Sequence, residues 1–370
     1  MNKGIVKLRL AGKEYIGWEE ISITRSIEDV AGTFSLTVSD PPENGRNALD
    51  LRPGDECEVL IDKTLVITGY LDSVNVDYTA TSHNLRFDGR SKTKDLVDCS
   101  ALQTQQFVNS TVEQIAKKLA ADYGIQVVVR GDGGKPVPNF QVQPNGETVF
   151  DALQRLCGPA NLLITDTPEG HLLLTNVKGT KTKNVIVNNG KLNTNIKSCN
   201  FTVGEHNRYS KIVVRGQSRA TDTNFGRQVS GIMAEALDPE IRRTRIKIIR
   251  ADVEVSTDDA TQKALWEMKA SAAKGIEINY VMYSWYGNQN ELWQPGQTVE
   301  VTDTLCGIDH KDLVIARVEY RIDNSSGTTC TLVLNPAEAF EKDKEKQVKK
   351  AKLKTKVVKQ HAPLVAPAVE

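Results

Sequence analysis

The side chains in this sequence that could act as acids or bases stand apart from one another. His310 lies in the run Asp309-His310-Lys311-Asp312, where an imidazole beside a carboxylate could form an acid–base pair. A charged run between two apolar segments is also typical of a surface turn, and that is the role we predict. The other histidines are isolated: His83, His171, His206 and His361. We therefore expect no catalytic residue.

Nucleotide and metal chemistry have no matching motif in the sequence. It contains no GxSxG elbow, Walker loop or HExxH helix. The glycine-rich run 131–135 precedes Pro136 and no strong helix, so we predict a flexible loop and no phosphate cradle. Isolated thiols in a reducing compartment, with no metal or cofactor site, are our prediction for the cysteines. They are scattered singly, without a CxxC pair: Cys57, Cys99, Cys157, Cys199, Cys306 and Cys330.

Two groups of residues could serve carbohydrate chemistry. Asp258 and Asp259 could form the carboxylate pair of a glycoside hydrolase, but their place at the start of a predicted helix favours complementation of the helix dipole. Trp285, Tyr286 and Trp293 could stack on sugars. In a β-rich domain such aromatic residues more often fill the core or a contact between subunits, which we predict here.

The composition restricts the class of protein. The 370 residues carry 47 Lys+Arg and 47 Asp+Glu, so the zero net charge gives no reason to expect a nucleic-acid binder or a membrane-surface protein. No stretch approaches the roughly 20 apolar residues of a membrane span. Charges such as Lys7 and Arg9 interrupt the N-terminal segment, unlike a secretory signal. We expect two or three domains that fold in the cytoplasm of the producing cell.

Residues 1–98 predict a small antiparallel barrel. Gly12-Lys13 has the chemistry of a hairpin turn, and 40–45 that of a loop. Short runs of alternating or apolar residues, separated by such turns, are typical of strands in a barrel or sandwich. The predicted strands are 4–10, 20–27, 33–38, 57–61, 65–71 and 84–88.

Residues 99–177 predict a small α+β domain. A capping box at Ser110 and Glu113 begins an amphipathic helix that Gly124 ends. A second helix is predicted over 148–157, where apolar residues fall on one face. The predicted strands of this domain are 125–130, 162–165 and 171–176.

Residues 178–340 predict a second antiparallel barrel. Residues 178–195 form a polar connector, and 217–244 a long mobile excursion. One strong helix is predicted over 256–274, with Ser256 or Thr257 as N-cap and Gly275 as its stop. The predicted strands are 199–203, 211–215, 276–286, 297–302, 312–322 and 328–334.

Residues 341–370 are rich in lysine and then in proline and alanine, which predicts a mobile or locally helical tail. Three roles remain open for this tail: a solvated segment, docking onto an acidic partner, and loose contact with DNA. Contact with DNA has the least support of the three, because no aromatic residues interleave the lysines.

An internal repeat links the two barrel-like regions. The segment Leu51-Arg52-Pro53-Gly54-Asp55 resembles Trp293-Gln294-Pro295-Gly296-Gln297, and each copy leads into a strand. A Leu-Val-Ile strand follows in both, at 65–67 and 313–315. Pro-Gly turns before strands are common, so chance is the alternative. The ordered agreement favours two copies of one barrel, so that a closed trimer would present six similar barrels around one axis.

Several segments, in this order, resemble the Mu-type phage baseplate hub family, also called the late control D or contractile-tail hub family. They are Gly17-Trp18, Ile23–Glu28 with Val30–Phe34, Leu51-x-Pro53-Gly54, Thr68–Ser73, Gly89–Cys99, the helix start at Thr111–Leu119, Glu147–Leu153 and Leu292-Trp293-x-Pro295. The resemblance covers about residues 1–340. Each segment is a weak signal by itself, and the ordered set is specific.

The resemblance implies a non-enzymatic structural protein of a phage virion. A homotrimer would form a ring that joins the sixfold tail tube to the threefold central spike, with DNA passing through its channel without sequence recognition. Tail tube and neighbouring baseplate proteins would be further partners. The hub part of type VI secretion spike proteins is related, and since this chain ends without a fused spike, we expect a separate spike protein. A tail-associated carbohydrate-binding protein or a peptidoglycan-degrading enzyme is the alternative.

Overall fold

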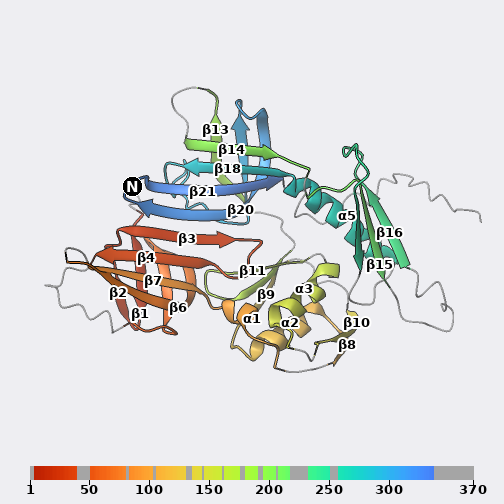
Figure 1. The fold of residues 1–370 in the computed structure, drawn as a ribbon, viewed down its shortest axis with the longest axis horizontal. Coiled ribbons are helices and arrows are strands. Elements are labelled where there is room, and N and C mark those ends of the chain that lie inside the picture. Colours follow the sequence, from red (N-terminus) through yellow and green to blue (C-terminus); the bar gives the residue numbers. More distant parts are fainter. Residues whose placement is uncertain are drawn as a thin grey trace, which may run out of the picture.

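A computed structural model describes residues 4–39, 51–80, 83–102, 106–130, 136–143, 146–160, 162–175, 180–190, 195–205, 207–216, 232–250 and 257–336. The fold is mainly β, as the sequence predicted, and its largest element is a 13-stranded sheet (Figure 1). The two halves of this sheet come from the two ends of the described chain, and smaller units pack beside it.

The N-terminal half of the large sheet contains all six predicted strands, but β2 was not predicted and β6 continues to Tyr78, past its predicted end at residue 71. Alternating burial along β3 and β4 reflects the alternating sequence pattern, because successive side chains of a strand point to opposite faces. The Ala11-Gly12 turn, with both φ values positive, joins the first hairpin. The strands are β1 (Val6–Leu10), β2 (Lys13–Tyr15), β3 (Glu20–Ser26), β4 (Thr33–Ser39), β5 (Glu56–Ile61), β6 (Thr64–Tyr78) and β7 (His83–Ser91).

The C-terminal half contains a strand that the sequence analysis missed. Residues 180–188, inside the predicted polar connector, form β13 and pair in parallel with β19. Lysine, threonine and asparagine occupy six of the nine positions of this strand, so its alternation was hidden by polar composition. The strands of this half are β13 (Thr180–Asn188), β14 (Ile196–Val203), β18 (Ile276–Met282), β19 (Gln297–Asp303), β20 (Ile308–Asp323) and β21 (Gly327–Pro336).

The two halves have the same strand order. The N-terminal order is β3-β4-β7-β6-β5-β1, and the C-terminal order is β14-β18-β21-β20-β19-β13. In each half, one residue of each of four neighbouring strands is paired with the next, which gives a row of four residues across the sheet. The row ends at the residue just before a bulge in the longest strand of that half, β6 or β20. The rows are Ile23, Phe34, Gly89 and Leu71 in one half, and Phe201, Ile278, Leu334 and Ile315 in the other.

The repeated Pro-Gly turn has the same geometry in both halves. Gly54 and Gly296 have φ values of +92° and +81°. The Gly54 amide donates to the Leu71 carbonyl, and the Gly296 amide donates to the Ile315 carbonyl, each at 2.8 Å. These carbonyls belong to the corresponding residues of the long strands, so the resemblance between the two segments reflects one repeated structural unit.

Neither half closes into a barrel, so the prediction of two antiparallel β-barrels is wrong in that respect. The strand path is open and continues from β20 of one half into β3 of the other. β3 pairs antiparallel with β20, from Arg317 opposite Ser26 to Ile322 opposite Ile21. The edge that could have closed the first half on itself is therefore used to join the halves, which lie side by side in Figure 1.

The α+β insert lies between the halves in sequence and packs beside them (Figure 1). Helix α2 begins with a capping box, but Thr111 and Gln114 form it, one residue beyond the predicted Ser110 and Glu113. Gly124 follows this helix with a φ of +66°. The elements are α1 (Lys94–Asp98), β8 (Gln106–Ser110), α2 (Val112–Ala121), β9 (Val127–Arg130), β10 (Val137–Gln141), α3 (Val149–Ala160), β11 (Leu163–Asp166) and β12 (Leu172–Thr175).

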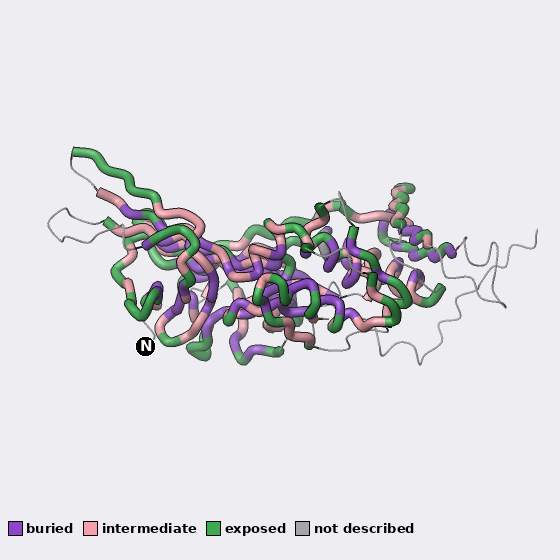
Figure 2. The backbone as a smooth tube through the Cα atoms, turned by 90° about the horizontal axis from the view of Figure 1, so that it is seen from below, coloured by how far each residue is buried: buried purple, intermediate pink, exposed green. Residues whose placement is uncertain are grey.

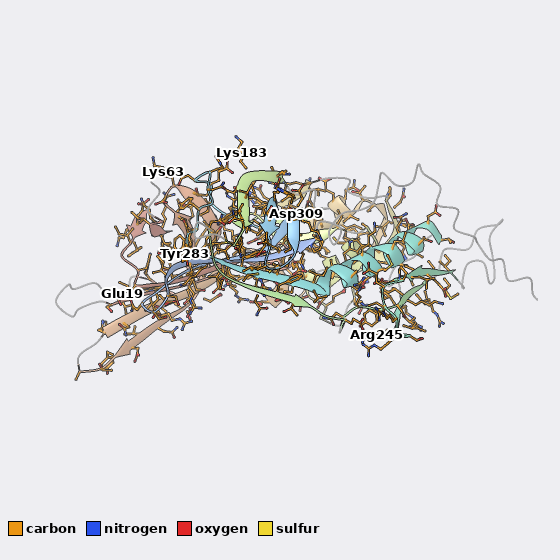
Figure 3. All side chains as sticks on the ribbon, turned by 90° about the horizontal axis from the view of Figure 1, so that it is seen from above. Glu19, Lys63, Lys183, Arg245, Tyr283 and Asp309 are labelled. Carbon is orange, nitrogen blue, oxygen red and sulfur yellow. The ribbon has the colours of Figure 1, made fainter. Side chains whose placement is uncertain are left out.

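A second small unit interrupts the C-terminal half. Strands β15 (Lys211–Gly216), β16 (Ile232–Leu237) and β17 (Ile246–Arg250) form a sheet, against which α5 (Thr257–Lys274) packs through Ala260 and Ala264. The predicted excursion over 217–244 was therefore too long, because its last part contains β16. Helix α5 ends before Gly275, as predicted. Arg245, just before β17, lies at the opposite end of the molecule from Glu19 (Figure 3).

The main core spans both halves of the large sheet. It includes Ile23, Leu36 and Val59 from one half and Tyr280 and Val301 from the other. Figure 2 shows buried residues along the middle of the molecule, with exposed strand ends and outer turns. None of the helices among the described residues combines the length and the apolar character that crossing a bilayer requires.

Replacing Gly54 or Gly296 with alanine should lower the free energy of unfolding by about 1–2 kcal/mol, because a Cβ disfavours positive φ. No atom lies within 4 Å of a Cβ at Gly54, and only Ile27 lies near one at Gly296, at 3.5 Å. The strain is thus in the backbone. Urea denaturation measures the loss. Gly158→Ala is the control, since Gly158 lies inside α3 and alanine favours a helix. Equal losses in all three variants would contradict this account.

Candidate functional site

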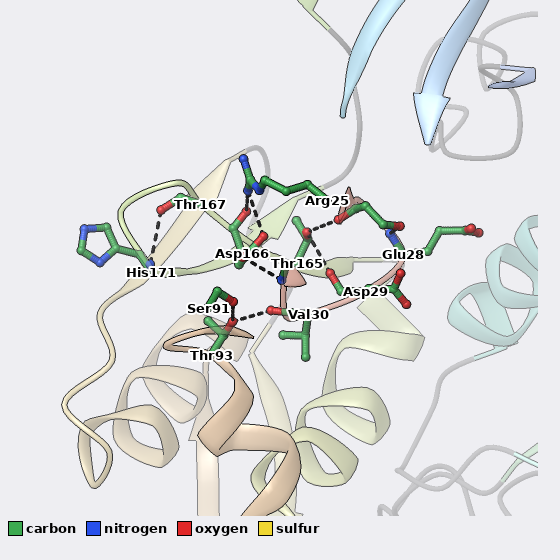
Figure 4. Close-up of polar contacts among 12 residues, drawn as sticks. Arg25, Glu28, Asp29, Val30, Ser91, Thr93, Thr165, Asp166, Thr167 and His171 are labelled. Atoms are coloured by element: carbon green, nitrogen blue, oxygen red, sulfur yellow. Dashed lines mark hydrogen bonds and ion pairs between the residues drawn. The ribbon is translucent and has the colours of Figure 1, made fainter. Parts of the chain in front are cut away.

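A polar junction joins the N-terminal sheet to the α+β insert (Figure 4). It consists of Arg25 in β3, Gly32 just before β4, and Thr165 and Asp166 at the end of β11. Arg25 Nη2 lies 2.9 Å from Asp166 Oδ1 and also donates to the Asp166 carbonyl at 2.9 Å. Both side chains are buried, with 7% and 1% of their surface exposed. A buried ion pair needs such additional hydrogen bonds to offset its desolvation.

Backbone contacts complete the junction. The Gly32 amide donates to Asp166 Oδ2 at 3.2 Å, and Thr165 Oγ1 donates to the Ser26 carbonyl at 2.8 Å. A Cβ on Gly32 would lie 3.2 Å from Ile67 and 3.3 Å from the Arg25 side chain. Glycine therefore lets the loop between β3 and β4 pack closely against Ile67 of β6 and the Arg25 side chain. Thr93 Oγ1 donates to the Val30 carbonyl of the same loop.

Residues of the C-terminal half line a cavity that borders the junction. The cavity has a volume of about 640 Å³ and is lined by Arg25, Arg130, Asp166 and the Gln294–Gln297 turn, among others. Arg25 is also opposite Val318 in the pairing of β3 with β20. The N-terminal half, the insert and the C-terminal half therefore meet around one arginine, which gives this site a positioning role in the fold.

This junction was not predicted from the sequence. Arg25 and Gly32 fall within the segments that resemble the hub family, but their partner Asp166 is 141 residues from Arg25. Asp166 follows a short apolar strand, where a carboxylate is equally typical of a turn. The signal available in the sequence was an arginine on the apolar face of a predicted strand. The alternation places Arg25 on the same face as Ile21 and Ile23.

His310 lies on the surface, as predicted, but within β20 and not in the turn before it. Its side chain is 71% exposed, and Nδ1 lies 2.9 Å from Glu300 Oε1. The hydrogen bond to Glu300, with the nearby charge of Asp309, raises the pKa of His310 above its ordinary value. A more strongly held proton makes this imidazole a poorer general base at neutral pH.

The aromatic candidates belong to the core. Trp285 is 1% exposed and Trp293 is fully buried. The indole nitrogen of Trp285 donates to the Thr329 carbonyl at 2.8 Å, and Tyr320 donates to the Trp293 carbonyl. Tyr286 is half-buried and donates to Asp62, which ties the C-terminal half to the N-terminal one. These rings fill the interior, as predicted, and the two tryptophans cannot stack on a sugar in this conformation.

Two cysteines expected to be isolated lie together. The Sγ atoms of Cys199 and Cys306 are 3.6 Å apart, and these two thiols and a carboxylate oxygen of Asp303 lie within 4.8 Å of one another. Such a group could offer three ligands to zinc. Burial raises the pKa of both thiols, that of Cys306 to about 12, which opposes binding because the thiolate is the ligand. Separation by 107 residues hid this pair from the sequence analysis.

The remaining candidate residues either have a local structural role or lie outside the described residues. Asp258 and Asp259 lie in the first turn of α5, where they complement its dipole as predicted. The backbone amide of His171 donates to Thr167 Oγ1 in a turn. The glycine-rich run 131–135, His206, Ser256, His361 and the lysine-rich tail lie outside the described residues.

Family models of phage tail baseplate proteins match three successive regions of this chain, which makes it a phage tail baseplate protein. The matches are the N-terminal region of the Mu phage baseplate assembly protein GpP-like family over residues 5–91, the second domain of the baseplate hub protein gp44-like family over 93–176, and the fourth domain of GpP over 256–343.

The chain is also 32% identical over 343 residues to the baseplate hub protein gp44 of Escherichia phage Mu, covering 90% of this chain and 88% of that protein. It therefore belongs to the Mu-type baseplate hub protein family. The 43 kDa tail protein of prophage MuSo2 from Shewanella oneidensis is similar in structure, with a TM-score of 0.77, 29% identity and coverage of 91% and 99% of the two chains. A tail protein from Neisseria meningitidis MC58 shares the fold, with a TM-score of 0.76, 24% identity and coverage of 91% and 99%.

Replacing Asp166 with asparagine should lower the free energy of unfolding by about 3–5 kcal/mol, because Arg25 would remain buried without its counter-charge. Chemical denaturation measures this loss. The matched control is Asp29→Asn, which removes the exposed pair with Arg317 and should cost less than about 1 kcal/mol. Similar losses for the two variants would show that the junction does not depend on the buried pair.

His310 should titrate above its ordinary pKa of 6.5 in an NMR titration of its ring protons. Glu300→Gln should lower the pKa, and Asp309→Asn should lower it less, because the bond to Glu300 is the larger cause. Since the folded-state pKa is raised, the stabilisation by this pair is complete at pH values below the unfolded-state pKa. It is lost as the pH rises through the folded-state pKa. A pKa that Glu300→Gln leaves unchanged would contradict the assignment.

Proposed function

We propose that this protein is a non-enzymatic structural subunit of a contractile-tail baseplate, and that three copies form a ring. The ring would join the sixfold tail tube to the threefold central spike and line the channel for DNA. The observation that supports this most directly is the repeated sheet. One chain carries two halves of equal strand order, already joined by β3 and β20.

The repeated half-sheet matters because of the symmetry that it would give to a trimer. Three chains with two similar halves each would present six similar surfaces around one axis, while the whole particle stays threefold. A tube built on sixfold symmetry and a spike built on threefold symmetry could then bind opposite faces of one ring. The working domain boundaries for this arrangement are 1–98, 99–177 and 178–340, with a tail at 341–370.

The proposed partners follow from this position in the particle. They are a second and third copy of the chain, a separate spike protein, and the tail tube and neighbouring baseplate proteins. DNA would pass through the channel without sequence recognition, as the absence of net charge in the chain allows. The protein would assemble in the cytoplasm of the host bacterium and remain in the virion.

The candidate chemistry supports a structural role better than the carbohydrate-binding or peptidoglycan-degrading alternative. Trp285 and Trp293 are buried, and His310 forms an exposed ion pair whose pKa is raised. Asp258 and Asp259 lie in the first turn of a helix. None of these features favours the alternative.

The purified chain should have the mass of a trimer in light scattering coupled to size exclusion, and negative-stain images should show a ring with a central hole. A monomer at every concentration, or retention on a peptidoglycan matrix by a monomer, would contradict the proposal. Clearing of cell walls that Asp258→Asn abolishes would favour the hydrolase alternative.

A further inference from the structure

Two strand edges of the large sheet expose apolar side chains. On β6, beyond its pairing with β5, Val76 is 50% exposed and Tyr78 is 76% exposed. On β14, Phe201 is 39% exposed and Val203 is 67% exposed. Among the described residues, no strand pairs with the outer side of either segment. Exposed edges with apolar side chains are prone to pair with another strand.

The internal repeat relates each of these edges to a strand of the other half: residues of β6 to residues of β20, and residues of β14 to residues of β3. Val76 lies five residues after Leu71, and Tyr320 lies five residues after Ile315, across the same bulge. Phe201 occupies the position of Ile23, because each begins the row of paired residues that ends at the bulge. Val76 and Phe201 are therefore the counterparts of Tyr320 and Ile23.

Those counterparts form the contact that joins the halves of one chain. Tyr320 lies directly opposite Ile23 in the pairing of β20 with β3. Tyr320 is 1% exposed and Ile23 is fully buried. The same two positions are thus covered where the repeat meets its own second copy, and uncovered at the two outer edges.

We propose that β14 of one chain pairs antiparallel with residues 73–78 of β6 in the next chain, reproducing the β3–β20 contact between subunits. This inference rests on the proposed ring and names the surfaces that close it. The register follows from the repeat: Val74 opposite Val203, Val76 opposite Phe201 and Tyr78 opposite Cys199. Each pair brings apolar or weakly polar side chains together on one face.

Two physical gains favour this contact. The unpaired backbone groups of both edges would acquire hydrogen-bond partners, and the exposed apolar surface would be buried. The contact is also heterologous, since each subunit offers a different edge to each neighbour. Repetition of a heterologous contact closes a ring when its rotation divides a full turn, as three copies of this two-half chain require.

A charge placed on either edge tests the inference. Val76→Asp destroys the β6 edge and leaves β14 intact, whereas Phe201→Asp does the reverse. Each variant by itself should be monomeric in light scattering, because every contact needs both edges. An equal mixture of the two should form a 1:1 dimer at high concentration, since one intact edge of each kind remains. A trimer for either variant, or a mixture that stays monomeric, would overturn the inference.

Matched variants separate the edge from general effects of charge or misfolding. Met233→Asp changes a residue of β16 that is 53% exposed, outside both edges, and should leave the oligomer unchanged. Thermal unfolding followed by circular dichroism should show that Val76→Asp and Phe201→Asp remain folded. If either variant unfolds, the milder Val76→Thr and Phe201→Thr replace them and should weaken the trimer in dilution series.

A disulfide trap tests the register. The double variant Val76→Cys, Phe201→Cys should form cross-linked dimers and trimers on a denaturing gel after mild oxidation, because opposite Cα atoms of an antiparallel pair lie within disulfide range. The oxidised wild type and Val76→Cys, Met233→Cys are controls that should not cross-link in this pattern. A wild-type trimer without these cross-links would refute the edge pairing and leave the ring standing. A wild-type monomer would refute the proposed ring itself.

Discussion

The antiparallel pairing of β3 with β20 is the contact on which the arrangement of this chain depends. It joins segments about 300 residues apart and turns two half-sheets into one. A strand edge in water satisfies its amide and carbonyl groups with solvent, but an edge with apolar side chains gains more from a partner strand. Covering Ile23 and Tyr320 therefore decides how the halves meet, and the rest of the fold is built around that contact.

The α+β insert distinguishes the β3–β20 contact from the proposed contact between β14 and β6 of neighbouring chains. Arg25 holds the position in β3 that Val203 holds in β14, and its partner Asp166 comes from the insert. A charged residue can be buried there because the insert supplies a carboxylate and a carbonyl. The unit that follows β14 is instead the small sheet of β15, β16 and β17 with α5. A valine at this position suits the apolar strand that we propose as its partner.

The repeat also explains why weak sequence similarity can accompany close structural equivalence. What recurs is a small set of constraints: a Pro-Gly turn with positive φ, a hydrogen bond to the residue before a bulge, and alternation along the long strand. Most other positions need only to be apolar on one face and polar on the other. Two halves can therefore diverge in identity while their backbone hydrogen bonds remain the same.

The sequence by itself determined most strands of the N-terminal half, though not β2 or the second half of β6. It also determined the helices near residues 112 and 257, the Pro-Gly repeat and the resemblance to hub proteins. These features are local or ordered patterns. It missed β13, whose polar residues hide the alternation, and misplaced the capping box by one residue. Only the tertiary structure decided that the sheet stays open, that Arg25 meets Asp166, and that Cys199 meets Cys306. Each of these contacts joins distant segments whose pairing depends on which edges remain uncovered after the local elements have formed, and a local pattern carries no record of that choice.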